Sequence, residues 1–390
     1  MDLMIYNRGD RKKTREESKM SKEFNIENID RNFKIETNID AEDLRLYDVK
    51  KAPFELYGFY EPFKRLPDEV ANDETVNPNV SKLYKMSAGG RVRFGTDSPY
   101  IAIKAVMPNI SRSTKGTFLG NAGFDLYIDS DDGFDSMFCR SFIPPMSVKE
   151  DCGYESKITF KSSKFRYYTI NFPLYSEVSD LYIGIADGST LTGGVKYRSF
   201  LPIVYYGTSI TQGACASRPG NAYQAMVSRE LNIDFLNIGF SDGGRGEKAM
   251  ADYFAKLPMS AFVCDYSTNV GPAGLKNTFL DFYKTFREAQ PDVPYIMVGR
   301  PDFYRETPDF PNIKDMAMNR FIMVETYNYA VQNGDENVYY IDGESLFQRM
   351  HSDSCTVDGI HPNDLGFEYM SEAVVSVLRR ILRDGKMKRR

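Results

Sequence analysis

From residue 201 onward, short apolar runs alternate with longer segments in which apolar residues recur with a helical period. This alternation is typical of parallel strands joined by helices, and it predicts an α/β fold with a five-stranded parallel sheet. The predicted strands comprise residues 203–206, 234–238, 261–265, 295–298 and 338–342. The predicted helices comprise residues 221–231, 246–257, 275–290, 312–333 and 364–383.

Polar residues stand at or just past the ends of four of these apolar runs. They are Ser209, Asn237, Asn269 and Asp342. In open parallel sheets, ligands bind outside the carboxyl ends of the strands. The sequence therefore predicts a functional site at that edge of the sheet.

The first of these residues, Ser209, lies in a turn between Gly207 and Gly213. A serine that stands clear at the head of a sheet can act as a nucleophile, but it needs an adjacent base. Taken alone, this Gly-x-Ser-x-x-x-Gly pattern is more often an ordinary turn from a strand to a helix. The assignment of a nucleophile therefore depends on a base elsewhere in the chain.

The chain contains two histidines, and one of them follows a carboxylate in the segment Asp358-Gly-Ile-His361-Pro-Asn. A carboxylate that fixes the orientation of an imidazole is half of a Ser-His-Asp hydrolase site. His361 is thus the candidate base for Ser209, and Asp358 is the candidate orienting acid. The second histidine, His351, lies in a polar stretch and is predicted to be a surface residue.

Candidate oxyanion donors follow the second and third apolar runs. A glycine-rich loop begins near Asn237, and Asn269 follows the third run. Backbone N–H groups and an amide side chain can stabilise a developing oxyanion, with each donor contributing about 10²–10³ in rate. Taken alone, Asn269 is more often the cap of a loop.

The order of these motifs resembles that of the SGNH hydrolases, also called GDSL-like esterases and lipases. The resemblance covers residues 201–383 and rests on four blocks: Gly207-Thr-Ser-Ile-Thr-Gln-Gly213, Asn237 through Gly243, Asn269, and Asp358-Gly-Ile-His361-Pro-Asn.

This resemblance implies a flavodoxin-like hydrolase domain. It also implies that Ser209 is the nucleophile, His361 is the general base and then the acid, and Asp358 is the orienting carboxylate. The N–H of Ser209 and the side chain of Asn269 would be two oxyanion donors. In the first block, Thr208 stands where the family commonly has Asp.

The third oxyanion donor is where the chain departs from the family, because Asp242 stands where the second block usually has Gly. A carboxylate close to a developing oxyanion would oppose it electrostatically. Either Asp242 turns its side chain outward, or Gly243 provides the N–H through a shift of one residue. The sequence leaves both alternatives open.

Residues 36–200 contain short alternating or aromatic runs separated by Gly, Pro, Asp and Ser, which predicts an all-β, jelly-roll-like sandwich domain. The predicted strands comprise residues 100–106, 124–128, 157–160, 166–172 and 181–185. We place the domain boundary near residue 200, with a charged segment at 1–35 and the hydrolase domain at 201–390.

One run in this half, Gly123-Phe-Asp-Leu-Tyr127, is similar to the Gly-x-Asp-Leu-Tyr signature of the β-rich domain that precedes the hydrolase in one SGNH subgroup. Apolar and polar residues alternate through residues 124–129. This pattern favours a half-buried strand over direct contact with a substrate.

Composition argues against several other classes of protein. With 49 basic and 54 acidic residues, the chain has no global field that would attract nucleic acid. Five scattered cysteines predict reduced thiols, and Cys215 is predicted to be a packing residue and not a nucleophile. Neither a metal site nor a dinucleotide or Walker-type loop is predicted, so no cofactor is expected.

The sequence also bears on the location and assembly of the protein. No stretch reaches the roughly 18 apolar residues of a membrane span, and the first residues carry charge where a secretory signal is apolar, which favours a cytoplasmic protein. An exposed face of the sandwich could mediate homo-oligomerisation, but no periodic seam demonstrates it.

Together these features predict a bacterial-type serine esterase that hydrolyses carboxylic esters through an acyl-enzyme. The expected substrates are short-acyl esters, such as acetyl esters, of carbohydrate-like molecules. One alternative is a lipase or thioesterase for longer acyl chains. Another is a carbohydrate-binding protein whose hydrolase domain has decayed, which Asp242 would favour.

Overall fold

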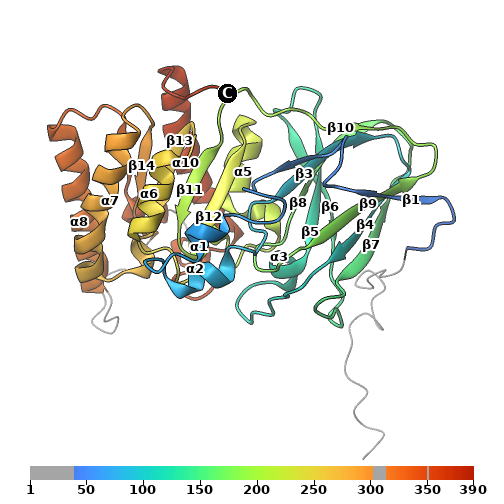
Figure 1. Cartoon of the computed structure of the whole chain (residues 1–390), viewed down its shortest axis with the longest axis horizontal. Helices are drawn as coiled ribbons and strands as arrows, with labels where there is room; N and C mark the ends of the chain where they lie inside the picture. Colours follow the sequence, from blue (N-terminus) through green and yellow to red (C-terminus); the bar gives the residue numbers. More distant parts are fainter. Residues whose placement is uncertain (1–38, 302–312, 349–350) are drawn as a thin grey trace, which may run out of the picture. The chain divides into compact units, whose positions relative to one another are not determined.

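The computed structural model describes residues 39–301, 313–348 and 351–390. The predicted charged segment at 1–35 and the first residue of the helix predicted at 312–333 lie outside these described residues. Within them, the chain forms one five-stranded sheet and two further β-sheets (Figure 1).

The carboxyl-terminal half contains the predicted parallel sheet, in the order β12-β11-β13-β14-β15. Its strands are β11 (Ile203–Gly207), β12 (Phe235–Gly239), β13 (Ala261–Asp265), β14 (Tyr295–Val298) and β15 (Val338–Ile341). This is the flavodoxin-like order, in which the direction of winding reverses beside β11. The α/β fold with five parallel strands is confirmed.

Helices cover both faces of this sheet, as its continuous apolar strands require. Ile203 and Tyr205 pack against the side that carries α5 (Tyr223–Leu231) and α10 (Asp364–Arg383). Val204 and Tyr206 pack against the side that carries α6 (Lys248–Lys256), α7 (Pro272–Ala289) and α8 (Ile313–Gln332). The five predicted helices are therefore present, and α4 (Ser209–Gln212) and α9 (Gly343–Leu346) are short additions.

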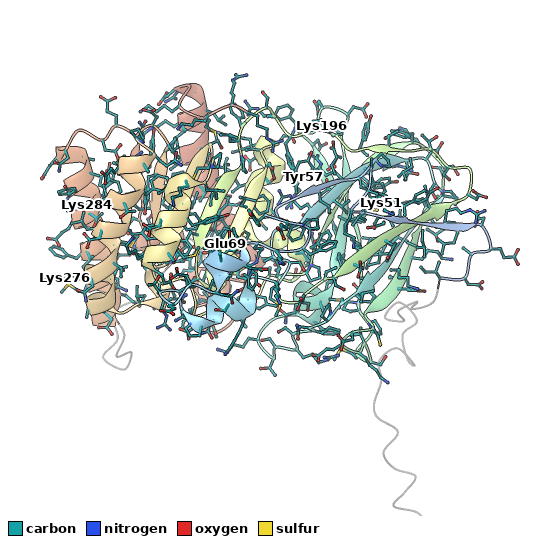
Figure 2. All side chains as sticks on the ribbon, in the orientation of Figure 1. Lys51, Tyr57, Glu69, Lys196, Lys276 and Lys284 are labelled. Carbon is teal, nitrogen blue, oxygen red and sulfur yellow. The ribbon has the colours of Figure 1, made fainter. Side chains whose placement is uncertain are left out.

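Helix α7 shows how the sequence period produces this packing. Leu275, Phe279 and Phe286 recur on one face of the helix and are fully buried. Lys276 and Lys284 are exposed and point away from the sheet (Figure 2). The amphipathic period therefore determines which face of α7 meets the core.

The amino-terminal half is β-rich, and every strand pair in it is antiparallel. One sheet has the order β1 (Leu44–Asp48), β9 (Asp180–Ala186), β4 (Tyr100–Val106), β7 (Tyr154–Thr159). The other has the order β10 (Leu191–Gly193), β3 (Arg91–Thr96), β8 (Arg166–Asn171), β5 (Phe124–Asp129), β6 (Ser136–Phe142), with β2 (Glu55–Tyr57) paired to β3. Apolar residues of both sheets share one core, which makes a sandwich.

Two short helices of the amino-terminal half, α1 (Asp68–Ala71) and α2 (Pro78–Leu83), belong to the core of the α/β half. Val80 on α2 is fully buried in the same cluster as Ile238 and Phe240. Beside them, the buried guanidinium of Arg65 donates to the carbonyl oxygen of Gly239 at 2.7 Å. Residues before 200 thus contribute directly to the α/β core.

The third helix of this half, α3, spans Phe118–Ala122.

Strand β5 is present as predicted, but the prediction that it is half-buried is wrong. Asp125 is 0% exposed, because the segment before α5 covers its face of the strand. The Asp125 carboxylate accepts hydrogen bonds from the Gly220 N–H at 2.7 Å and from the Asn171 amide at 2.7 Å, and it forms an ion pair with Arg218. The residue at the centre of the Gly-x-Asp-Leu-Tyr signature therefore ties the two halves together.

None of the described helices is both long and apolar enough to span a membrane.

Asp125→Ala is expected to lower the free energy of unfolding by about 3 kcal/mol or more, because it leaves Arg218 and the Gly220 N–H without their buried partner. Urea denaturation followed by circular dichroism measures this change. The matched control is Asp187→Ala, which removes an exposed ion pair with Arg45 and should have little effect. Equal effects of the two substitutions would contradict the role given to Asp125.

Candidate active site

Ser209 is placed by the turn between β11 and α4. Thr208 caps α4 together with Thr211 in a reciprocal capping box, so Ser209 is the first residue of that helix. Gly207 has no room for a side chain, since a Cβ there would lie 2.1 Å from the hydroxyl oxygen of Thr211. Gly213 ends the helix with a φ of +103°, a conformation that favours glycine. The structure therefore explains why glycine occupies both positions of the predicted turn.

His361 and Asp358 lie next to Ser209, although 152 residues separate Ser209 from His361. The Ser209 Oγ and the His361 Nε2 are 2.9 Å apart, and the His361 Nδ1 is 2.9 Å from Asp358 Oδ2. An ionised carboxylate can only accept, so Nδ1 carries a hydrogen and Nε2 is free to accept the hydrogen of the serine hydroxyl. The three side chains form one continuous line of hydrogen bonds.

A tight turn fixes the position of the Asp358 carboxylate relative to the His361 ring. Asp358 Oδ1 accepts the backbone N–H groups of Ile360 at 3.1 Å and His361 at 2.9 Å. Burial alone would raise the pKa of Asp358, but hydrogen bonds from Lys115, the His361 N–H and the His361 ring outweigh it and hold that pKa well below its usual range. Asp358 therefore stays ionised and can stabilise a protonated imidazole.

The side chain of Asp242 faces away from the loop interior. It is 69% exposed, forms an ion pair with Arg245 and accepts a hydrogen bond from Asn79 at 3.2 Å. Within the described residues, the backbone N–H of Asp242 has no hydrogen-bond partner, whereas the N–H of Gly243 donates to the carbonyl of Phe240 at 3.0 Å. Of the two alternatives, this geometry matches the outward turn of Asp242.

Asn269 has a structural partner for each of its amide hydrogens. They donate to the carbonyl oxygens of Phe240 at 3.2 Å and Gly244 at 3.0 Å, which holds the glycine-rich loop in place. The role of Asn269 as an oxyanion donor stays a prediction.

The other two strand-end residues serve neighbouring structure. Asn237 lies inside β12, where its amide donates to the carbonyl of Thr211 at 2.8 Å and supports α4 from below. Asp342 caps α9 and pairs with Arg320 at 2.8 Å. The hydrogen bonds of Asn237 and Asp342 therefore stabilise the neighbouring helices.

Two residues of the β-rich half reach the site, and sequence reasoning did not find them. Lys115 Nζ lies 2.7 Å from Asp358 Oδ2. The hydroxyl of Tyr175 donates to the carbonyl of Ser209 at 3.3 Å and lies 2.6 Å from the hydroxyl of Ser241. Both residues lie in segments between elements, far from Ser209 in the chain, so neither apolar period nor local motif marks them.

The two alternative reactive groups do not compete with this arrangement. Burial, followed by the nearby charge of Asp358, raises the pKa of the Cys215 thiol to about 11, so the thiol stays protonated at neutral pH. His351 is exposed, as predicted. Across the residues that the structure describes, no cluster of three His, Cys, Asp or Glu side chains could hold a metal ion.

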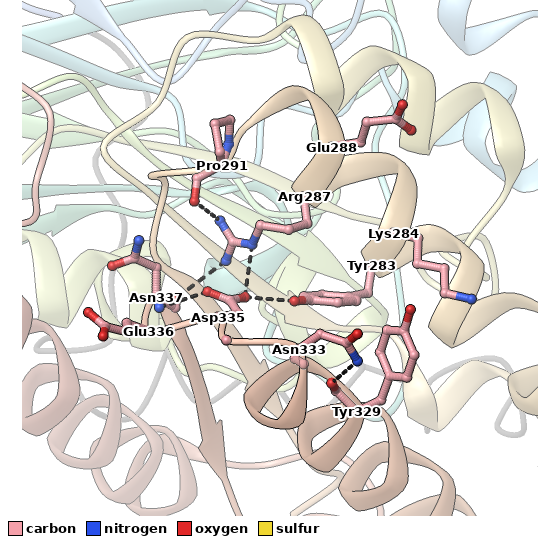
Figure 3. A pocket seen from close by; sticks show the side chains of 12 residues that line it. Tyr283, Lys284, Arg287, Glu288, Pro291, Tyr329, Asn333, Asp335, Glu336 and Asn337 are labelled. Atoms are coloured by element: carbon pink, nitrogen blue, oxygen red, sulfur yellow. Dashed lines mark hydrogen bonds and ion pairs between the residues drawn. The ribbon is translucent and has the colours of Figure 1, made fainter.

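A cavity of about 650 Å³ lies between α7, α8 and the segment before β15 (Figure 3). Asn337 lines it and directly precedes β15, so the cavity is at the amino end of the sheet, opposite to Ser209. Arg287, its central cation, pairs with Asp335 and donates to several backbone carbonyls. The donors of Arg287 are thus used to join α7 to the following segment, and the cavity takes no part in the active site.

Asp265 is fully buried beneath the nucleophile helix, where it accepts a hydrogen bond from Thr211 at 3.1 Å. Burial raises the pKa of Asp265 to about 8, against which the hydrogen bonds from Thr211 and Tyr223 act. The unfolded chain has the ordinary value of 3.8. Between these two pH values the folded protein binds the additional proton, so its stability falls as the pH rises toward 8.

Asp265→Asn is therefore expected to flatten the dependence of stability on pH and to make the protein more stable than the wild type at pH 8. Thermal unfolding midpoints of both proteins at several values between pH 5 and pH 8.5 measure this. Asp187→Asn, at an exposed site, is the control. Parallel curves for wild type and Asp265→Asn would contradict the assignment of this proton to Asp265.

Comparison with known proteins supports the same reading of both halves. The model of the GDSL-like lipase/acylhydrolase family matches residues 201–379, and the model described as the N-terminus of Esterase_SGNH_hydro-type matches residues 44–191. No curated protein matches the chain significantly.

Solved structures resemble the chain over most of its length. A Bacteroides ovatus protein classed as a GDSL-like lipase is 30% identical, with a TM-score of 0.75, and the match covers 89% of this chain and 99% of that one. A salicylyl-acyltransferase from a tetracycline biosynthetic pathway is 18% identical, with a TM-score of 0.68 and coverages of 88% and 98%.

An acetyl xylan esterase from the rumen bacterium Butyrivibrio proteoclasticus is 12% identical, with a TM-score of 0.55 and coverages of 87% and 99%. At these lower identities the similarity shows a common fold. The B. ovatus protein is similar in sequence as well, across nearly its whole length. The chain therefore belongs to the GDSL-like lipase/acylhydrolase family and is a hydrolase.

Proposed function

We propose that the protein is a serine esterase in which Ser209, His361 and Asp358 form the catalytic triad. The observation that carries this proposal is the continuous line of hydrogen bonds from the Ser209 hydroxyl through the His361 ring to the Asp358 carboxylate. Nucleophile, base and orienting acid are the three roles that such a line supplies.

In the proposed reaction, His361 Nε2 takes the hydroxyl proton as Ser209 Oγ attacks the ester carbonyl. Asp358 stabilises the protonated ring through Nδ1. His361 then gives its proton to the departing alcohol, which leaves an acyl group on Ser209. A water molecule, deprotonated by His361, attacks this acyl-enzyme and releases the carboxylic acid and the free serine.

The developing negative charge on the carbonyl oxygen needs donors close to Ser209. The backbone N–H groups of Ser209 and Asp242 are the proposed pair, because neither has a hydrogen-bond partner in the described part of the chain. The Asp242 carboxylate does not oppose the charge strongly, since it faces solvent and is paired with Arg245. This outward position supports the catalytic alternative over a decayed, non-catalytic protein.

For the substrate, we propose short-acyl esters of carbohydrate-like alcohols. The similarity in fold to an acetyl xylan esterase supports this class. The polar groups near Ser209 support it too, since Lys115 pairs with Asp358 and the Tyr175 hydroxyl donates to the carbonyl of Ser209. A lipase or thioesterase that acts on longer acyl chains is the rival within the same family.

Ser209→Ala or His361→Ala is expected to lower kcat/KM for 4-nitrophenyl acetate by about 10⁴-fold or more, since each removes a member of the triad. His351→Ala is the matched control, because this histidine is exposed and should leave the rate unchanged. Circular dichroism establishes that each variant is folded. Wild-type turnover by a folded Ser209→Ala variant would refute the proposed mechanism.

The acyl preference is tested with 4-nitrophenyl esters of two to twelve carbons and with acetylated xylan. We expect kcat/KM to be highest for acetyl or propionyl esters, and acetate to be released from the polysaccharide. A maximum at eight carbons or more would favour the lipase or thioesterase reading, while the triad assignment would stand.

A further inference from the structure

Asp358, the proposed triad acid, is shared between the two halves of the chain. Its Oδ2 lies 2.9 Å from His361 Nδ1 and 2.7 Å from the Nζ of Lys115, a residue between β4 and α3. The Lys115 side chain is 60% exposed and the Asp358 side chain is 16% exposed. The lysine is therefore the more exposed member of this ion pair, and the carboxylate oxygen that it contacts is also the one that faces the His361 ring.

The segment that carries Lys115 is anchored to the site and is not a free loop. Thr117, two residues later, caps α3 and donates from its hydroxyl to the carbonyl of Ser217 at 2.7 Å. Ser217 in turn donates its N–H to Asp364, the first residue of α10, at 2.8 Å. Because α10 begins three residues after His361, the lysine and the acid are held by one connected set of contacts.

Given the proposed function of the triad, on which this inference rests, we propose that Lys115 is a positioning residue. Lys115 orients the Asp358 carboxylate and offsets part of the negative charge that the His361 ring faces.

A carboxylate beside an imidazole stabilises the protonated ring, and a cation beside that carboxylate weakens this effect. The other titratable or hydroxyl groups described at the site are uncharged. They are the Ser209 hydroxyl, the Tyr175 hydroxyl, whose pKa burial raises well above its usual value, and the Cys215 thiol, which stays protonated because burial raises its pKa to about 11. Lys115 is thus the cation that balances Asp358 in the described part of the site. The consequence is that the protonated ring faces less net negative charge than Asp358 alone would supply.

The test compares Lys115→Met with Lys115→Arg and with the wild type. In Lys115→Met, we expect the acidic limb of the pH profile of kcat/KM for 4-nitrophenyl acetate to move upward by about half a pH unit, which lowers kcat/KM about threefold on that limb. KM should change little, because the small ester has no group for the ammonium to bind. Lys115→Arg keeps the charge and should restore the wild-type profile.

Lys104→Met is the matched control, since Lys104 forms a partly exposed ion pair with Glu155 on the β-rich half. Its pH profile should match the wild type. An unchanged profile for Lys115→Met, or a loss of rate that is equal at every pH, would overturn the proposal.

A second measurement does not depend on esterase activity. The chain has only two histidines, so after labelling with [¹³Cε1]-histidine, two ring signals can be followed by NMR through a pH titration. In Lys115→Met the His361 signal should titrate at higher pH than in the wild type, while the His351 signal stays in place as an internal reference. Identical titrations of His361 would overturn the proposal even if no ester were found to be a substrate. If neither the wild type nor Ser209→Ala hydrolysed any of the esters tested, that result would instead refute the proposed function.

Discussion

The buried carboxylate of Asp125 is the contact on which the placement of the active site depends. It accepts the Gly220 N–H and pairs with Arg218, in the short segment that joins the nucleophile helix α4 to α5. A buried charge that loses its partners costs several kcal/mol, so other placements of the β-rich sheets against this segment are strongly disfavoured. Once the sheets are held there, Lys115 reaches Asp358 and Tyr175 reaches the backbone carbonyl of Ser209.

At the site itself the charge of Asp358 is balanced by Lys115 on the one hand and faces the His361 imidazole on the other. Each group limits the effect of its neighbour: the carboxylate orients and stabilises the ring, and the lysine moderates the carboxylate. The charge of Asp242, beside the proposed oxyanion donors, is limited in the same way, because Arg245 pairs with it at the surface. The residues that carry formal charge near Ser209 are therefore compensated before a substrate enters.

Much of the α/β half could be predicted because its strands are buried on both faces and read as continuous apolar runs. Asp358 and His361 were found because the acid and the imidazole lie in one short turn. Strand β3 was missed, since Arg91 and Arg93 read as surface residues although both are buried in ion pairs. The partners of Asn269 could not be predicted either, because they are backbone carbonyls whose positions depend on the fold of the loop.

The backbone of Asp242 has a φ of +50°, in the left-handed region that glycine adopts most easily. Aspartate is among the few other residues that tolerate this region, so it can stand where relatives of the family usually have glycine. The exchange adds a side chain that glycine lacks, and that side chain is anchored to Asn79 on α2. The loop that carries the proposed oxyanion donor is therefore held at its side chain by α2, through a contact that a glycine at this position could not make.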